Sequence, residues 1–149
     1  FLHLSDLHYG SKEFSLECME NIIDYVNSKK NTLDMVFIKG DLTEKGKFEQ
    51  FDKIKGFISQ MDIDKLVVVG NHDAKYNYIL NFEKFFGTRI TRKFLMEHNL
   101  LALGLRSAKD DLKLGDLGEY QLKYIVQQFL NFPDSRKNLS APSSFKSCS

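Results

Sequence analysis

The sequence predicts an α/β fold in which layered βαβ units form a mostly parallel sheet covered by helices. Three short apolar runs, at residues 1–4, 35–38 and 66–69, have the length and character of buried strands. The two longer segments between them carry apolar residues at helical spacing. Because a strand, helix, strand crossover builds a parallel sheet, this alternation predicts a layered α/β half in residues 1–70.

The composition is that of a globular protein with almost no net charge. Hydrophobic residues make up 42% of the 149 residues and charged residues 28%, which excludes a wholly disordered chain. Because the formal net charge is +1, no overall electrostatic field recruits nucleic acid or an anionic membrane. Cys18 and Cys148 lie far apart and lack the paired spacing of a zinc ribbon.

The sequence shows neither a targeting segment nor a transmembrane segment. No charged leader with an apolar core is present, and no apolar run approaches the roughly 20 residues that span a bilayer. We therefore expect a cytoplasmic protein without a membrane partner. The chain begins with Phe1 inside an apolar run rather than with methionine, so we also expect it to be a portion of a longer protein.

Two amphipathic helices are expected between the three strands. The first begins after Ser15, whose side chain can cap a helix, and polar residues occupy its other face. The second repeats this pattern. The apolar positions of the first helix are Leu16, Met19, Ile22, Ile23 and Val26, and those of the second are Phe48, Phe51, Ile54 and Ile58.

The remaining elements complete the expected domain. We expect a short aromatic helix at residues 78–86, a fourth strand at 100–105 and, after a turn at 115–118, a helix at 119–130. Pro133 ends that helix, so the domain is expected to cover residues 1–132. Residues 133–149 are rich in serine and are expected to form a flexible tail. The apolar side of the last helix comprises Leu122, Ile125, Val126, Phe129 and Leu130.

Residues that can bind a metal follow each of the first three strands. Because the carboxyl ends of parallel strands share one edge of a sheet, where ligands bind, these side chains can converge. An Asp or Asn after one strand is ordinarily turn chemistry, but three successive strands with such residues favour a metal site. Oxygen and imidazole ligands without cysteine suit Mn, Fe or Zn. The three motifs are Asp6 and His8, then Gly40 and Asp41, then Gly70, Asn71, His72 and Asp73, and the candidate ligands among them are Asp6, His8, Asp41 and Asn71.

In this order and spacing, the three motifs resemble those of the calcineurin-like metallophosphoesterases, over an N-terminal portion of that family's fold. The run from residue 101 to 107, followed by Gly115, Gly118 and Gln121, is most similar to the cyclic-nucleotide phosphodiesterase branch. The resemblance implies a hydrolase that cleaves a phosphomonoester or a phosphodiester with a metal-bridging hydroxide. The implied partner is a phosphate-ester substrate, with a nucleotide among the candidates.

The resemblance also implies roles for individual residues. Two divalent ions, which Mn, Fe, Zn or Ni could supply, would be held by Asp6 and His8 at the first site and by Asn71 at the second. Asp41 would bridge both ions. His72 would lie beside the scissile phosphate as a catalytic residue, and Asp73 would hold the His72 imidazole in position.

The family pattern continues with further histidines, which the chain lacks. A histidine after another strand and a glycine-histidine-x-histidine segment complete the metal sites of the family. We expect His3 to be a core histidine and His98 a surface histidine, so neither replaces them. The metal sites are therefore expected to be incomplete in this chain.

Two other functions remain open. The chain as it stands is alternatively a catalytically incomplete module that binds or scaffolds a partner. A nuclease is the other alternative, but the near-neutral charge does not favour nucleic acid as a partner. The sequence carries no sign of the oligomeric state.

Overall fold

The computed structural model describes residues 1–108 and 115–141. Its strands are β1 (Leu2–Leu4), β2 (Val36–Lys39), β3 (Lys65–Val68), β4 (Thr91–Leu95), β5 (Leu100–Gly104) and β6 (Arg136–Ser140). Its helices are α1 (Leu16–Ser28), α2 (Phe48–Ser59), α3 (Ile79–Phe86) and α4 (Gly118–Asn131), with short 3-10 turns at Lys75–Asn77 and Met96–His98. The elements alternate as an α/β fold requires.

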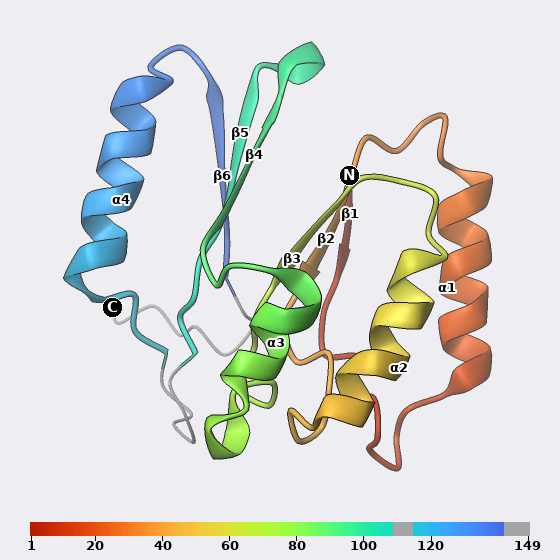
Figure 1. The fold of residues 1–149 in the computed structure, drawn as a ribbon. Coiled ribbons are helices and arrows are strands. Elements are labelled where there is room, and N and C mark those ends of the chain that lie inside the picture. Colours follow the sequence, from red (N-terminus) through yellow and green to blue (C-terminus); the bar gives the residue numbers. More distant parts are fainter. Residues whose placement is uncertain (109–114, 142–149) are drawn as a thin grey trace.

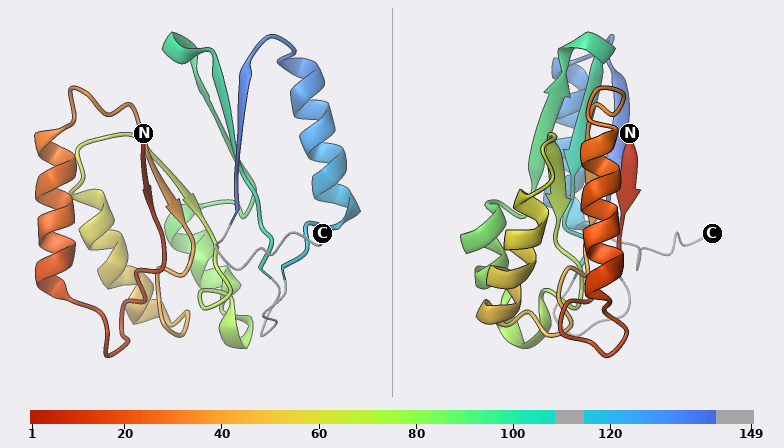
Figure 2. Two further views of the ribbon diagram at one scale, coloured as in Figure 1. Left: turned by 180° about the vertical axis from the view of Figure 1, so that it is seen from behind. Right: turned by 90° about the vertical axis from the view of Figure 1, so that its right-hand side faces the viewer.

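The described elements form four layers (Figure 1). Strands β1, β2 and β3 make a parallel sheet in that order, and α1, α2 and α3 lie on one of its faces. The second sheet has the order β4, β5, β6, with β5 antiparallel to β4 and parallel to β6. Helix α4 covers the outer face of this second sheet (Figure 2). The predicted α/β class with βαβ units is therefore confirmed.

The central strand β2 shows why its sequence is apolar throughout. Val36 and Ile38 pack under the helices, whereas Phe37 packs against the second sheet with Leu66 and Ala102. Successive side chains of a strand point to opposite faces, so a strand covered on both faces needs apolar residues at every position. This double coverage holds the carboxyl end of β2 rigidly between two cores.

The predicted helices between the first three strands are also confirmed. Ser15 caps α1 by accepting a hydrogen bond from the Cys18 amide at 3.2 Å. The residues of α1 and α2 that the structure buries are Met19, Ile23, Val26, Phe51, Ile54 and Ile58, all of which lie on the predicted apolar faces. These helices fix the positions at which the chain enters β2 and β3.

Strands β4 and β6 were not expected from the sequence. Each has one edge without a partner strand in the described sheet, and each contains charged residues at exposed positions, so neither shows an apolar run. The expected fourth strand is β5, whose position is confirmed but which lies in the second sheet. Strand β6 lies in the segment assigned to a flexible tail, so that expectation is wrong for residues 136–140. Residues 142–149 of the tail lie outside the described residues.

The apolar side of α4 is only half buried. Ile125 is buried against the second sheet, whereas Leu122, Val126 and Leu130 are 53%, 58% and 74% exposed. A single sheet covers one stripe of a helix, and here that stripe also includes Gln121 and Gln128. No helix in the described part of the chain has the length and apolar character to cross a membrane.

Candidate metal centre

The loops that follow β1 and β2 continue side by side beyond the ends of the strands. The amide of Asp6 donates to the Gly40 carbonyl at 3.3 Å, and the amide of His8 donates to the Asp41 carbonyl at 2.9 Å. Tyr9 and Thr43 then form an isolated parallel bridge. This extended pairing brings the two loops to the same edge of the sheet, at the lower side of Figure 1.

Three predicted metal ligands meet at this edge. Asp6, His8 and Asp41 each offer a ligand atom within 4.8 Å of the others. The Nε2 atom of His8 lies 3.9 Å from Oδ1 of Asp6. The chain therefore presents two carboxylates and an imidazole to a common point, and this donor set fits a divalent cation such as Mn²⁺ or Zn²⁺.

The same three residues have an unusual backbone conformation. Their φ angles are 58° for Asp6, 47° for His8 and 50° for Asp41, in the left-handed region that side chains with a Cβ rarely adopt. Asp and His tolerate this region better than most residues, and such strain concentrates at functional sites. The strained backbone is a second observation, independent of the ligand distances, that favours a functional role for this edge.

The loop after β3 joins the other two through Asp41. The Oδ1 atom of Asp41 accepts a hydrogen bond from the His72 amide at 2.8 Å. Asn71 lies between His72 and Gly70, directly beside this contact. The predicted ligand Asn71 and the predicted catalytic residue His72 therefore follow β3 at the edge where Asp6, His8 and Asp41 meet.

Two glycines allow the ends of β2 and β3 to approach each other. A Cβ atom on Gly40 would lie 2.7 Å from the Cα of Gly70, and Gly40 has a φ of +81°. A Cβ atom on Gly70 would overlap the backbone nitrogen and Oδ1 of Asp41. These glycines therefore serve a close approach between two backbones and the Asp41 side chain.

We expect Gly40→Ala to lower the free energy of unfolding by at least about 2 kcal/mol, since it adds left-handed strain to a backbone clash. The matched control is Gly56→Ala in α2, where an added Cβ meets nothing within 4 Å. There alanine should raise the free energy of unfolding by about 0.5–1 kcal/mol, because it favours a helix. Urea unfolding of both variants measures the difference, and equal effects would contradict this role of Gly40.

Glu44, which was not among the predicted site residues, lies between the two histidines of the site. Its Oε2 atom is 3.0 Å from Nδ1 of His8 and 3.4 Å from Nδ1 of His72. The Lys75 ammonium lies 3.8 Å from the other carboxylate oxygen of Glu44 and 2.7 Å from Nδ1 of His72. Partial burial acts to raise the pKa of Glu44, but His72, His8 and Lys75 together lower it below its usual value. Glu44 follows Asp41 by three residues in the sequence, but only the fold brings its carboxylate to the histidines.

Asp73 does not orient the His72 ring in the way the resemblance implied. Its carboxylate is fully buried and accepts hydrogen bonds from the amides of Leu42, Thr43 and Gly70 and from the Thr43 hydroxyl, at 2.9–3.2 Å. It therefore ties the loop after β2 to the loop after β3. Burial raises the pKa of Asp73 to about 6, because the hydrogen bonds only partly offset the desolvation and the nearby charge of Asp41.

The remaining histidines, His3 and His98, lie away from the site. His3 is exposed and stacks on Phe37, so the expectation of a core histidine is wrong. The side chain of His98 is 37% exposed, and its Nε2 atom lies 2.7 Å from Oδ1 of Asp34. Asp34 precedes β2 whereas Asp41 follows it, which puts His98 at the opposite edge of the sheet.

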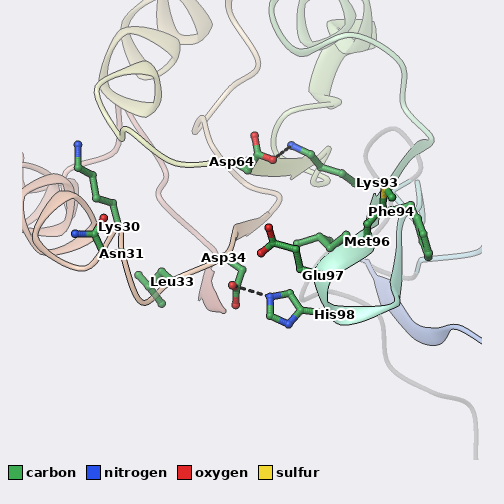
Figure 3. A pocket seen from close by; sticks show the side chains of 11 residues that line it. Lys30, Asn31, Leu33, Asp34, Asp64, Lys93, Phe94, Met96, Glu97 and His98 are labelled. Carbon is green, nitrogen blue, oxygen red and sulfur yellow. Dashed lines mark ion pairs between the residues drawn. The ribbon is translucent and has the colours of Figure 1, made fainter.

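A cavity of about 500 Å³ lies at that opposite edge (Figure 3). Two ion pairs cross it, Asp34 with His98 and Lys93 with Asp64, each at 2.7 Å. Its charges are therefore largely compensated within the chain. We call the edge of the sheet where Asp6, His8 and Asp41 meet the metal edge. A cavity of about 310 Å³ lies there and is lined by Asp6, Leu7, His8, Ser11, Glu13 and Glu44.

Comparison with known families agrees with this geometry. The profile of the family described as calcineurin-like phosphoesterase matches residues 1–139, nearly the whole chain. The chain belongs to the calcineurin-like phosphoesterases. The family implies divalent metal ions, and the carboxylates and imidazole at the sheet edge fit that requirement.

Three relatives of the chain carry names of phosphodiesterases. A probable glycerophosphodiester phosphodiesterase GpdQ from Arcobacter nitrofigilis is 28% identical over 130 residues, which cover 80% of this chain and 45% of the relative. Probable cyclic nucleotide phosphodiesterases from Vesicomyosocius okutanii and Ruthia magnifica are 27% and 29% identical, over 60% and 61% of this chain and 40% of each relative. The chain thus spans less than half the length of these relatives.

Proposed function

We propose that this chain provides metal ligands and a catalytic histidine to a phosphodiesterase that depends on two divalent ions. The observation that carries the proposal is the convergence of Asp6, His8 and Asp41 beside His72 at one edge of a parallel sheet. Open α/β sheets bind their ligands at this edge. The expected cytoplasmic location belongs to the same proposal.

In this proposal, Asp6 and His8 hold one ion, Asn71 holds the other and Asp41 is shared between them. The ions, when bound, would polarise a phosphoryl oxygen and make water a stronger nucleophile near neutral pH. Asp41 is suited to a shared position because its carboxylate lies between the loops after β1 and β3. The oxygen-rich donor set is compatible with Mn, Fe, Zn or Ni, and metal availability would select among them.

His72 is positioned to act on the leaving group. Its ring centroid is 4.5 Å from that of His8, so a phosphate held next to His8 is within reach of the His72 imidazole. The imidazole can stabilise negative charge on the phosphate or donate a proton to the leaving oxygen. The Lys75 ammonium beside it adds positive charge where a phosphate would gather negative charge.

A phosphodiester is the substrate class that the relatives' names favour. One relative is named for glycerophosphodiesters and two for cyclic nucleotides, all of which contain a phosphodiester bond. These names support a small phosphodiester over a phosphomonoester or the phosphodiester backbone of a nucleic acid.

The second candidate function is a catalytically incomplete module that binds or scaffolds a partner. The positions of His3 and His98 favour this function, because both lie away from the site and neither can complete the metal centre. The two functions differ in whether the metal site turns over substrate. Calorimetry of the 149-residue chain with Mn²⁺ that shows tight binding of two ions would favour the phosphodiesterase.

We expect His72→Ala to lower kcat about 10²- to 10⁴-fold on a chromogenic phosphodiester with Mn²⁺, the range typical of a lost proton donor. The assay uses the longest natural polypeptide that contains this chain. Binding of Mn²⁺ should persist, since His72 holds no metal in the proposal. His98→Ala at the opposite edge is the control and should keep the activity of the wild type. Full activity of His72→Ala would contradict the assignment.

A further inference from the structure

Two exposed tyrosines, Tyr76 and Tyr78, lie on the turn that leads from His72 to α3, and the proposed function uses neither of them. Tyr76 is 65% exposed and Tyr78 is 39% exposed. Their ring centroids are 6.1 Å apart, and the ring planes are inclined at 60°. Neighbouring aromatic rings with this exposure add little to the core and form a candidate surface for binding a ligand.

Lys75 ties the turn that carries these rings to the metal edge. Its ammonium lies 2.7 Å from Nδ1 of His72 and 3.3 Å from the carbonyl oxygen of Glu44. Tyr76 follows Lys75 in the chain, and the Tyr78 amide donates to the Lys75 carbonyl at 3.0 Å. The turn lies below α3 in Figure 1, on the same side as the loops after β1 and β2. The backbones of both tyrosines are therefore held beside the residue that contacts the proposed catalytic histidine.

Tyr78 is also packed against the loop after β2. A Cβ atom on Gly46 would lie 3.1 Å from the Cβ of Tyr78, so the absence of a side chain on Gly46 leaves room for this contact. The side-chain amide of Asn81 donates to the Gly46 carbonyl at 3.0 Å and fixes the same loop to α3. This loop also carries Asp41 and Glu44, so the contact holds Tyr78 close to the metal edge.

Tyr76 has a strained backbone conformation. Its φ of 54° and ψ of 33° lie in the left-handed region, which a bulky side chain rarely adopts. Because the side chain is mostly exposed, the packing of the core does not explain the strain. Strained residues concentrate at sites that hold a ligand. The conformation of Tyr76 is thus a second observation, independent of the exposure of the pair, that favours a role in binding.

A nucleobase is the ligand whose chemistry fits an exposed tyrosine pair beside a phosphate site. Bases stack on aromatic side chains through their flat faces, and every base offers such a face. In a nucleotide one ribose separates the base from the phosphate, so a phosphate at the metal edge leaves its base close by. An aliphatic alcohol on the phosphate has no flat face and gains nothing from these rings.

We propose that Tyr76 and Tyr78 form a platform on which the base of a small nucleoside phosphodiester stacks while its phosphate lies at the metal edge. The proposal rests on the proposed function, to which it adds the part of the substrate that the chain selects. The two tyrosines determine specificity and take no part in the cleavage of the bond. The Lys75 ammonium between them and His72 faces the phosphate side of the same ligand.

The first experiment compares two substrates of the longest natural polypeptide that contains this chain, in the presence of Mn²⁺. 3′,5′-Cyclic AMP carries a base, whereas glycerophosphoethanolamine does not. We expect Tyr76→Ala to raise KM for cyclic AMP about 5-fold or more, the loss typical of a ring that stacks on a base, with kcat unchanged. The KM for glycerophosphoethanolamine should stay at the value of the wild type. Tyr78→Ala should act in the same direction.

Three further variants show whether stacking is the cause. Tyr76→Phe keeps the ring without its hydroxyl and should retain the KM of the wild type. Tyr76→Gly removes the ring but adopts the left-handed backbone without strain, so it should raise KM as alanine does while keeping the turn. Tyr25→Ala removes a ring that is 53% exposed on α1 and should leave both KM values unchanged.

The second experiment measures binding of 5′-AMP to the 149-residue chain by NMR, without any need for activity. A stacked base shifts the resonances of the ring protons that it covers. We expect such shifts at Tyr76 and Tyr78 and none at Tyr25. In Tyr76→Ala the affinity for 5′-AMP should fall about 5-fold or more, and Tyr76→Phe should recover it.

The outcomes separate this proposal from the proposed function. A KM for cyclic AMP that is unchanged in both alanine variants overturns the platform, and so does an equal rise of KM for the two substrates. Hydrolysis of glycerophosphoethanolamine alone by the wild type supports the proposed function and overturns the platform. If the wild type hydrolyses neither substrate, the proposed function fails and the 5′-AMP titration decides. Shifts at Tyr76 and Tyr78 then support the platform, and their absence overturns it.

Discussion

Asp41→Asn is expected to weaken Mn²⁺ binding more than about 100-fold, beyond the 10- to 100-fold loss typical of residues that only orient a ligand. The substitution removes the charge that two cations would share. It preserves the size of the side chain and its hydrogen bond, because the Asn amide oxygen can still accept from the His72 amide. Asparagine also tolerates the left-handed φ of 50° at this position. The loss of metal should therefore occur without loss of fold.

The measurement is calorimetry with Mn²⁺ on the chain, together with hydrolysis of a chromogenic phosphodiester by the longest natural polypeptide that contains it. The control is Asp24→Asn on the exposed surface of α1, which removes one negative charge far from the metal edge. It should leave both the Mn²⁺ affinity and the rate of hydrolysis unchanged. Circular dichroism of each variant confirms that the fold is retained. Mn²⁺ binding by Asp41→Asn equal to that of the wild type would contradict the shared-ligand role.

Asp73→Ala is expected to have the largest effect on stability, with a loss of about 3–5 kcal/mol in the free energy of unfolding. The substitution leaves the buried amides of Leu42, Thr43 and Gly70 without their acceptor, and it removes the link between two loops. Asp73→Asn keeps one acceptor oxygen and should lose less. Urea unfolding of both variants provides the comparison, and a loss below about 1 kcal/mol for Asp73→Ala would contradict the role.

The raised pKa of Asp73 adds a pH dependence to this prediction. The folded-state pKa of about 6 lies above the value of about 3.9 for an unfolded chain, so the folded state holds the proton more tightly. The contribution of Asp73 to stability is then fully present below about pH 4 and falls as the pH rises to about 6. The metal-free wild type should lose stability over this range relative to Asp73→Asn, which carries no titrating group at this position.

Local patterns in the sequence were sufficient to predict the helical side of the fold. Strands β1, β2 and β3 coincide with continuous apolar runs, and α1 and α2 carry apolar residues at helical spacing. Ser15 marks the start of α1 as expected. Strands β4 and β6 could not be predicted in this way, because an edge strand with charged residues becomes regular only through pairing with β5. The exposure of Leu122, Val126 and Leu130 in α4 could not be predicted either. The spacing of apolar residues does not show how wide a stripe of the helix the neighbouring sheet covers.

For the candidate site, the sequence predicted which residues would gather but not which atoms would meet. Asp6, His8 and Asp41 were expected at one edge because each follows a strand, and the structure brings them together. The contacts of Glu44 and Asp73 are hydrogen bonds between loops about 30 residues apart, and no pattern among neighbouring residues of the sequence predicts them. Asp73 follows His72 in the chain, but its buried carboxylate accepts hydrogen bonds from the amides of Thr43 and Gly70.

The hydrogen bonds between these loops also determine when the metal edge can form during folding. The contacts of His8 with Glu44, His72 with Asp41 and Thr43 with Asp73 join residues 36, 31 and 30 positions apart. The pairings of β1 with β2 and of β2 with β3 join residues equally far apart, so the complete edge forms together with the parallel sheet, and contacts of such long range make folding slow. The edge is consequently complete only in the folded chain. A cation that binds there acts on the native state alone and slows exchange of the His72 amide hydrogen along with global unfolding.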